Sequence, residues 1–417
     1  MARPRKATAV ALSVLLTGVC LMAGVQPTGA APVEPCGNLV TELLLQSTSR
    51  FAADGKIKRY RATIDFPGRT GFYDQTGKVF LGVYPAGSLP TIINPPIGDR
   101  STVGALVQSQ QPTALAAING DFFITQTIRG KAVEFSRGPM VRDGVILRAD
   151  MELAKVVGVD STGQPFAGTV GARGNISIGL GPKTALAGVN WHTVQAGGFT
   201  LYTNQWSQSS GSPRPAGVGE WVLNGRNKIV EVRTSTTNAA KRGLIVQGNT
   251  KVLAFPAALE SVAAAGVVGQ KVRLRVSQKT DSGVTLTTAV GRGMTLVKRG
   301  TAAPMGCEAY DHSAAARPRT VIGWTRSGVW RSMTVPGTNL SGTSRTGGIG
   351  LANIAAVAKQ LGLRFAYELD GGASTTWYTR STAGVWTRRD LVGVSGGTYE
   401  RPVDNGLAFL SPAAPVQ

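Results

Sequence analysis

The chain has 417 residues, and its 44 lysines and arginines outnumber 23 acidic residues, so its formal charge is +21. An apolar content of 42% is enough to bury a sizeable core, which excludes a predominantly disordered protein. The cations are scattered, without a long basic run or interleaved aromatic residues, so we expect no nucleic-acid partner. The charge suits either an anionic polymer of the cell envelope or simple solubility at a cell surface.

The first thirty residues have the three-part order of a secretory signal peptide. A short cationic stretch at residues 3–6 precedes a mostly apolar run over residues 7–25, and small residues follow at positions 28–30. The competing interpretation is a retained membrane anchor, but the apolar run is short for a membrane span. We expect cleavage after Ala30 and a secreted or wall-associated protein without stable membrane insertion.

The segments that follow alternate between strand and helix signals. Residues 31–50 are expected to form a linker or a first helix, and residues 55–95 alternate apolar and polar positions around Gly and Pro, which indicates strands and turns. A short helix is predicted over 99–108 with a cap among residues 99–101, followed by a buried strand at 114–118.

Short strand-like runs dominate residues 145–300. The clearest helix is predicted over 351–361, where apolar residues share one face and Gly362 provides a stop, and a strand follows at 365–369. The fold class expected is α/β (α+β), a single large strand-rich domain with mixed sheets and a few helices.

Two cysteines, Cys36 and Cys307, remain after the expected cleavage, and an exported compartment favours a disulfide between them. Together with only two histidines they are too few for a zinc cage. We therefore expect no metal and no cofactor.

Three segments share one design, an apolar strand that ends in polar and glycine residues. They are residues 116–123, 317–323 and 367–376. Rigid strands of α/β proteins often direct the residues after them into a crevice, so these strand ends are the candidate sites.

The third segment carries the most chemistry. Asp370 stands at the strand tip, and Gly371 and Gly372 lack a Cβ, so their backbone N–H groups can approach a ligand closely. Ser374 and Thr375 add hydroxyl groups. The same residues would also suit a tight turn before a capped helix, and their spacing alone leaves both interpretations open.

The other two segments offer an amide, a carboxylate and a cation. Asn119 and Asp121 flank Gly120, a pattern that also occurs in simple hairpin turns. Arg319, with Thr320 beside it, could hold a phosphate or a carboxylate, although a lone arginine at a strand start is often only a surface charge.

In this order and spacing, Ala-Ile-Asn-Gly-Asp-Phe-Phe, Arg-Pro-Arg-Thr-Val-Ile-Gly and Leu-Asp-Gly-Gly-Ala-Ser-Thr-Thr resemble the phosphodiester glycosidase family, that of N-acetylglucosamine-1-phosphodiester alpha-N-acetylglucosaminidase. The resemblance implies a domain over residues 98–411. Residues 31–97 would be a strand-rich segment of that domain, and residues 412–417 a tail.

The resemblance implies hydrolysis of a sugar-1-phosphodiester at the C1–O bond, which frees the sugar and leaves the phosphate on its carrier. Asp370 would be the main catalytic carboxylate, and Asp121, Glu134 or Glu368 its partner. The choice among these three stays open. The substrate implied is an anionic glycan or glycan phosphate.

The remaining roles follow from the same resemblance. Arg319 and the backbone of residues 371–374 would hold the phosphate, and Asn119 would orient the sugar. The family usually has a third glycine at Ala373 and often Glu at Asn353, and many relatives have Asn at position 368. These departures permit an alternative function, a non-catalytic envelope protein that binds anionic glycan on the same scaffold.

Overall fold

The computed structural model describes residues 39–65, 75–207, 214–244, 248–303, 317–337, 339–341, 344–391 and 398–412. The expected signal peptide and both members of the expected disulfide, Cys36 and Cys307, lie outside these ranges. The chain divides into two compact units, Met1–Glu34 and Pro35–Gln417, and every described residue belongs to the second.

An eight-stranded sheet contains the second and third sequence motifs. Its strands, in spatial order, are β1 (Leu39–Arg50), β2 (Lys56–Asp65), β3 (Gln75–Val83), β22 (Trp330–Val335), β21 (Arg319–Trp324), β25 (Phe365–Glu368), β19 (Thr295–Lys298) and β20 (Thr301–Ala302). Helix α4 (Leu351–Gln360) contacts β1, β19 and β20. It buries Ile354 and Val357 against Val321 and Leu296 of this sheet.

The expectation of a linker or helix over residues 31–50 is wrong for the described part, because Leu39–Arg50 is strand β1. Three consecutive leucines favour a helix by propensity. The segment nevertheless pairs with β2 in antiparallel register from Leu39↔Asp65 to Arg50↔Lys56. Non-local pairing decides the structure here, and local propensity does not reveal it.

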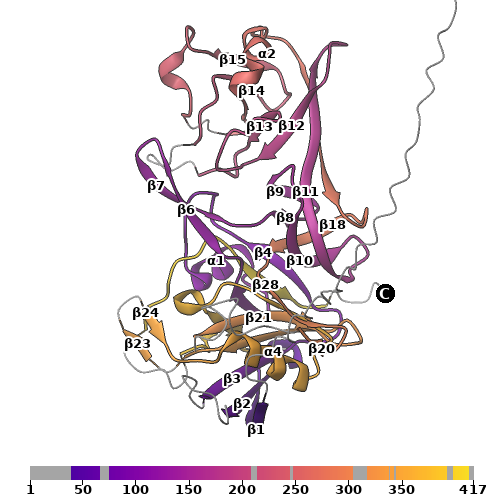
Figure 1. Cartoon of the computed structure of the whole chain (residues 1–417), viewed down its shortest axis with the longest axis vertical. Helices are drawn as coiled ribbons and strands as arrows, with labels where there is room; N and C mark the ends of the chain where they lie inside the picture. Colours follow the sequence, from indigo (N-terminus) through magenta and orange to yellow (C-terminus); the bar gives the residue numbers. More distant parts are fainter. Residues whose placement is uncertain are drawn as a thin grey trace, which may run out of the picture. The chain divides into compact units, whose positions relative to one another are not determined.

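An eleven-stranded sheet forms the middle of the sequence. In spatial order it contains β15 (Ile229–Arg233), β14 (Gly219–Leu223), β16 (Lys251–Phe255), β13 (Phe199–Tyr202), β12 (Thr184–Val189), β9 (Val145–Asp150), β8 (Met140–Arg142), β18 (Leu286–Gly291), β10 (Ala154–Asp160), β11 (Pro165–Ile178) and β17 (Val272–Thr280). The pair β12–β13 is parallel and the others are antiparallel, so the sheet is mixed. Strands β18, β10 and β11 run side by side in Figure 1.

A five-stranded sheet places the first motif beside the third. Its order is β27 (Trp386–Arg388), β26 (Trp377–Arg380), β5 (Ala116–Asn119), β28 (Gly406–Leu410) and β4 (Leu89–Ile93). Helix α1 (Val103–Gln110) packs against β5, β4, β26 and β28. Strand β26 follows the Asp-Gly-Gly segment directly and pairs with β5, so the two motifs meet through this sheet.

The smaller elements complete the fold. They are the hairpins β6 (Phe123–Ile128)–β7 (Lys131–Ser136) and β23 (Asn339–Ser341)–β24 (Ser344–Thr346), helix α2 (Glu260–Ala264), and the 3-10 turns η1 (Ala52–Asp54), η2 (Ala239–Lys241), η3 (Ala257–Leu259) and η4 (Gly372–Ser374). Strands far outweigh helices (Figure 1). The strand-rich prediction with mixed sheets is therefore confirmed, while the α/β label fits only loosely.

Both predicted helices are present. The first runs over Val103–Gln110 and so begins four residues later than predicted; its N-cap is Thr102, whose hydroxyl accepts a hydrogen bond from the Ala105 N–H at 3.2 Å. The second ends before Gly362, which has a φ of 81°. Within the described ranges, no helix is both long and apolar enough to cross a membrane.

Candidate active site

The three sequence motifs converge on the side chain of Asn119 at the end of β5. Its amide nitrogen donates to the Asp370 carbonyl at 2.7 Å, and its amide oxygen accepts from the Thr320 hydroxyl at 2.7 Å and the Thr376 N–H at 3.1 Å. The Asp370 N–H in turn donates to the Gly120 carbonyl at 2.9 Å. Asn119 is fully buried, so it fixes the relative positions of the motifs and does not reach into open space.

Asp121 is held in a buried pocket of hydrogen-bond donors. Its carboxylate accepts from the Ser136 hydroxyl at 2.9 Å and from the Gly138 N–H at 2.5 Å. Its own N–H donates to the Asn405 side-chain oxygen at 2.9 Å. Burial raises the pKa of Asp121 to about 6, even though these two donors favour the ionised form.

Asp370 is a second carboxylate with a perturbed pKa at the same place. It is half-buried, and burial raises its pKa to about 6, partly opposed by the nearby Ser374 hydroxyl and the Gly371 N–H. The Gly371 N–H donates to the carboxylate at 2.9 Å, whereas the Ser374 hydroxyl lies nearby without a well-aligned hydrogen bond. The negative charge of Asp121 adds a smaller increase to the pKa of Asp370.

Glu368 is bound to Arg319 in a buried ion pair. The Arg319 Nη1 atom lies 3.1 Å from the Glu368 Oε1 atom, and both side chains are buried. Burial raises the pKa of Glu368 and lowers the pKa of Arg319, while each charge opposes the shift of its partner. The phosphate role of Arg319 and the catalytic role of Glu368 stay predictions, and here each side chain neutralises the other.

The backbone of the Asp-Gly-Gly loop is largely engaged within the protein. The Gly371 N–H donates to Asp370, the Gly372 N–H to the Pro318 carbonyl at 2.9 Å, and the Ser374 N–H to the Gly371 carbonyl at 3.2 Å. A phosphate held by these N–H groups would have to displace the bonds within the loop. The phosphate role of this backbone also stays a prediction.

The sequence departures are accommodated without backbone strain. Within this loop Gly372 has a φ of 58°, whereas Ala373 does not have a positive φ. An alanine therefore fits at position 373 without occupying the left-handed region. Asn353 is buried on α4, and its side-chain oxygen has no hydrogen-bond partner within the described part of the chain.

A cavity of about 650 Å³ opens beside Asp121 and Glu368. Three cations line it, Arg137, Lys155 and Arg292. The other lining residues are Phe122, Gly138, Ala154, Gly293 and Met294. The cavity combines two carboxylates with three cations and has the size of a small-ligand site.

Arg292 is the best-positioned of these cations. Its guanidinium lies 4.3 Å from the centre of the Tyr367 ring and donates from Nε to the Val156 carbonyl at 3.2 Å. Arg137 and Lys155 are exposed. None of the three belongs to the predicted phosphate-binding set, and only the flanking glycines of Arg292 hinted at a close backbone approach in the sequence.

A further buried carboxyl group, Asp404, was missed by the sequence analysis. Burial raises its pKa to about 8, assisted by the negative charge of Glu134 and opposed by Arg148 and Arg100. Neither carboxyl oxygen has a hydrogen-bond partner among the residues described. The strand-end pattern did not mark it, because Asp404 lies two residues before the start of β28 (Gly406–Leu410) and not after the end of a strand.

Glu134, the third candidate partner of Asp370, lies at a different cavity. It forms an ion pair with Arg100 at 2.9 Å, and the two residues line a cavity of about 670 Å³ together with Asp99 and Pro402. The negative charge of Glu134 contributes to the raised pKa of Asp404. Asp121 and Glu134 therefore line different cavities. The catalytic roles of both stay predictions.

A prediction follows from the close approach of Gly291 to the Asp121 carboxylate. A Cβ at position 291 would lie 2.1 Å from Asp121 Oδ2, so a Gly291→Ala variant must displace that carboxylate. We expect kcat/KM to fall at least about tenfold, because small misplacements of reacting groups are costly. Gly225→Ala is the matched control, since its nearest contact would be an ordinary 3.6 Å. Equal activity of both variants would show that the position of Asp121 is unimportant.

Residues 219–410, just under half of the chain, match the family model for phosphodiester glycosidase. This stretch of the chain is similar to the phosphodiester glycosidase family. The resemblance predicted from the three motifs is thereby confirmed. The match includes Arg319, Asp370 and Asp404 but begins after Asp121.

Two solved structures share the fold at low sequence identity. A protein of Burkholderia pseudomallei described as exported is 14% identical, with a TM-score of 0.64 over 91% of this chain and 100% of that chain. A hypothetical protein from Synechocystis is 16% identical, with a TM-score of 0.59 over 85% of this chain. The chain spans only 62% of the Synechocystis protein.

The zebrafish N-acetylglucosamine-1-phosphodiester alpha-N-acetylglucosaminidase catalytic domain also matches, at 12% identity over 89% of this chain and 88% of that chain. Its TM-score of 0.43 is too low to support an argument about this chain. No curated protein sequence matches the chain.

Proposed function

We propose that the protein is a secreted hydrolase that cleaves a sugar-1-phosphodiester, of the N-acetylglucosamine-1-phosphodiester kind, at the C1–O bond of an envelope or extracellular glycopolymer. The observation that carries this proposal is that Asp121 lines a cavity together with three cations, while the backbone N–H of Asp370 donates to the carbonyl of Gly120, the residue before Asp121. The family of the domain supports a phosphodiester glycosidase activity.

The cations would hold the phosphate group of the substrate. Arg292, Arg137 and Lys155 line one cavity, so a phosphodiester there would be surrounded by positive charge. This assignment replaces Arg319, whose charge is neutralised by Glu368. Binding the phosphate through exposed Arg137 and Lys155 also leaves room for a long polymer to enter from solvent.

The carboxylates would act on the sugar. Water adds to C1 as the C1–O bond breaks, and the bond electrons leave with the phosphate oxygen, so the developing positive charge on the sugar needs a nearby anion. Asp370 and Asp121 supply that charge when ionised. Because a phosphate monoester is a good leaving group, strong general-acid assistance is less necessary than for an ordinary glycoside.

Both carboxyl groups have raised pKa values. Burial is the main cause and raises each pKa to about 6, and the charge of Asp121 adds a smaller increase for Asp370. At neutral pH both groups are mostly ionised, which is the form that stabilises an oxocarbenium-like centre.

The direct test is sugar release from a panel of sugar-1-phosphodiesters headed by N-acetylglucosamine-1-phosphate esters. We expect release by the natural protein and a loss of at least about a hundredfold in an Asp370→Ala variant. Asp281→Ala, an exposed turn residue, is the matched control and should retain activity. A folded protein that releases no sugar from any ester but retains anionic glycan would instead support the non-catalytic binding function.

A further inference from the structure

Three exposed aliphatic side chains gather at one end of the eleven-stranded sheet. Leu180 is 93% exposed, Val267 57% and Val268 61%. Single exposed aliphatic residues are ordinary, but clustered ones on loop tips indicate an interaction surface.

The sheet register brings the two loops together. Strand β11 ends at Ile178, which pairs with Val272 at the start of β17. The turn that carries Leu180 follows Ile178, and the turn that carries Val267 and Val268 precedes Val272. Both turns therefore project from the same end of the β11–β17 pair.

Hydrogen bonds hold both turns in place. The Gly181 N–H donates to the Ile178 carbonyl at 2.9 Å. The Val267 N–H donates to the Gln270 side-chain oxygen at 2.9 Å, and the Gly269 N–H donates to the Ile229 carbonyl of β15 at 2.8 Å. The aliphatic tips are thus presented to solvent by closed turns.

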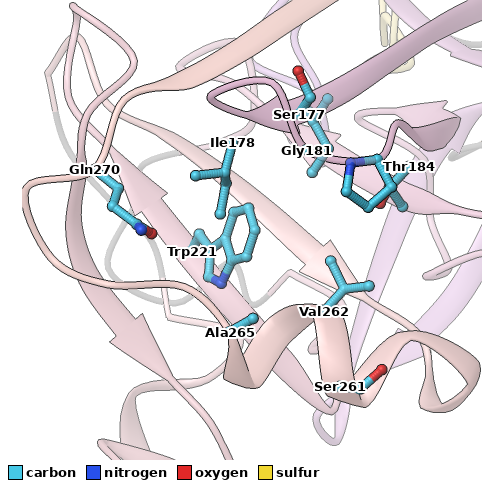
Figure 2. A pocket seen from close by; sticks show the side chains of 11 residues that line it. Ser177, Ile178, Gly181, Thr184, Trp221, Ser261, Val262, Ala265 and Gln270 are labelled. Carbon is cyan, nitrogen blue, oxygen red and sulfur yellow. The ribbon is translucent and has the colours of Figure 1, made fainter.

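An apolar pocket of about 390 Å³ lies between these turns (Figure 2). Ile178, Val262 and Ala265 surround the Trp221 ring, while Gln270 stands at one side. The Trp221 ring is buried beneath the pocket, and its indole N–H already donates to the Ala263 carbonyl at 2.8 Å, so it needs no polar partner from a ligand. The volume lies within the range of roughly 300–1,000 Å³ typical of small-molecule sites.

Two lysines lie beside the pocket. Lys183 and Lys271 are exposed, and each is next in sequence to a residue that lines the pocket. Arg273 and Arg275 are exposed on the other face of β17, opposite Val272 and Leu274, which pack in the same apolar cluster as Trp221. Glu260, at the start of α2, is the acidic residue beside the lining residue Ser261. The rim therefore carries a net positive charge.

We propose that this end of the sheet binds the surface of an anionic lipid bilayer. Leu180, Val267 and Val268 enter the boundary between head groups and acyl chains, one acyl chain occupies the Trp221 pocket, and the rim cations contact lipid phosphates. A soluble polyanion would satisfy the cations but would leave the aliphatic tips and the apolar pocket without a partner. The proposal is independent of the glycosidase function.

The test is flotation of the whole mature protein with vesicles of phosphatidylglycerol or of phosphatidylcholine. We expect partition onto phosphatidylglycerol and little onto phosphatidylcholine. The triple variant Leu180→Ser/Val267→Ser/Val268→Ser should partition at least about tenfold more weakly. Its matched control is Val145→Ser/Val385→Ser, because these valines are 61% and 60% exposed elsewhere on the protein. All five side chains are already exposed, so folding is not at risk.

Two further variants separate the parts of the proposal. Lys183→Gln/Lys271→Gln should reduce the preference for phosphatidylglycerol and its salt dependence. Ala265→Gln narrows the pocket mouth without adding charge and should also weaken partition, whereas unchanged partition would show that no acyl chain enters the pocket. Failure of the natural protein to bind phosphatidylglycerol vesicles would overturn the proposal. So would binding that the triple serine variant retains in full, which would indicate a polyanion surface.

Discussion

Replacing Asp121 with asparagine is expected to lower kcat/KM for sugar release by about a hundredfold to ten-thousandfold. The carboxylate lines the cation-rich cavity, and it directly follows Gly120, whose carbonyl accepts from the Asp370 N–H at 2.9 Å. Asparagine keeps an oxygen that can accept from the Ser136 hydroxyl or the Gly138 N–H, so the fold should survive. The measurement is kcat/KM beside Asp281→Asn, an exposed carboxyl that serves as the control.

The pH dependence gives the same prediction a second readout. Asp121 and Asp370 each have a pKa of about 6, and catalysis needs them ionised, so activity should fall as the pH drops below about 6. In Asp121→Asn the remaining activity should have its acid limb at lower pH, because the negative charge that raises the pKa of Asp370 is gone. An unchanged acid limb together with full activity would remove Asp121 from the mechanism.

The sequence pattern marked three separate candidate segments. That Asn119, Arg319 and Asp370 serve one site was implied by the family resemblance alone, and the pattern did not show how the three motifs meet. The structure unites them because one buried amide accepts two hydrogen bonds and donates a third. A hydrogen-bonded network of this kind depends on strand register between two sheets, which residue order does not specify.

The cavity residues show where sequence reasoning stops. Lys155 and Arg292 come from β10 and the end of β18, strands that pair with each other but are far apart in sequence. Scattered cations give no local pattern, so nothing distinguished Lys155 from the other basic residues, and only the flanking glycines distinguished Arg292. Arg319 illustrates the opposite case, since its motif was recognisable but its buried pairing with Glu368 was not.

The signal for helices and strands was more reliable where the pattern was local. The helix over Leu351–Gln360 was predicted within one residue because its apolar face and glycine stop lie in consecutive residues. Strand β1 was missed because its pairing partner β2 determines its structure. Asp404 was missed for the same reason, because it precedes β28, whose position is set by non-local pairing with β5 and β4.

An Asp404→Asn variant is expected to be more stable than the natural protein at pH 8, by an amount on the order of a few kcal/mol. Burial raises the pKa of Asp404 from 3.8 to about 8, and neither oxygen has a hydrogen-bond partner in the described ranges. Between about pH 4 and pH 8 the folded protein therefore binds a proton that the unfolded chain releases. Stability falls as the pH rises through this window, at about 1.4 kcal/mol per pH unit at most.

Asparagine has nearly the same shape as aspartate and cannot ionise, so it removes this loss. The gain should be small at pH 4 and largest at pH 8, as measured by denaturant unfolding of both proteins at the two pH values. Asp281→Asn, which replaces an exposed carboxyl, should show no such divergence. Activity at neutral pH should change little, because the natural Asp404 is mostly protonated there. A gain that is equal at both pH values would mean that packing, and not the charge on Asp404, limits stability at this site.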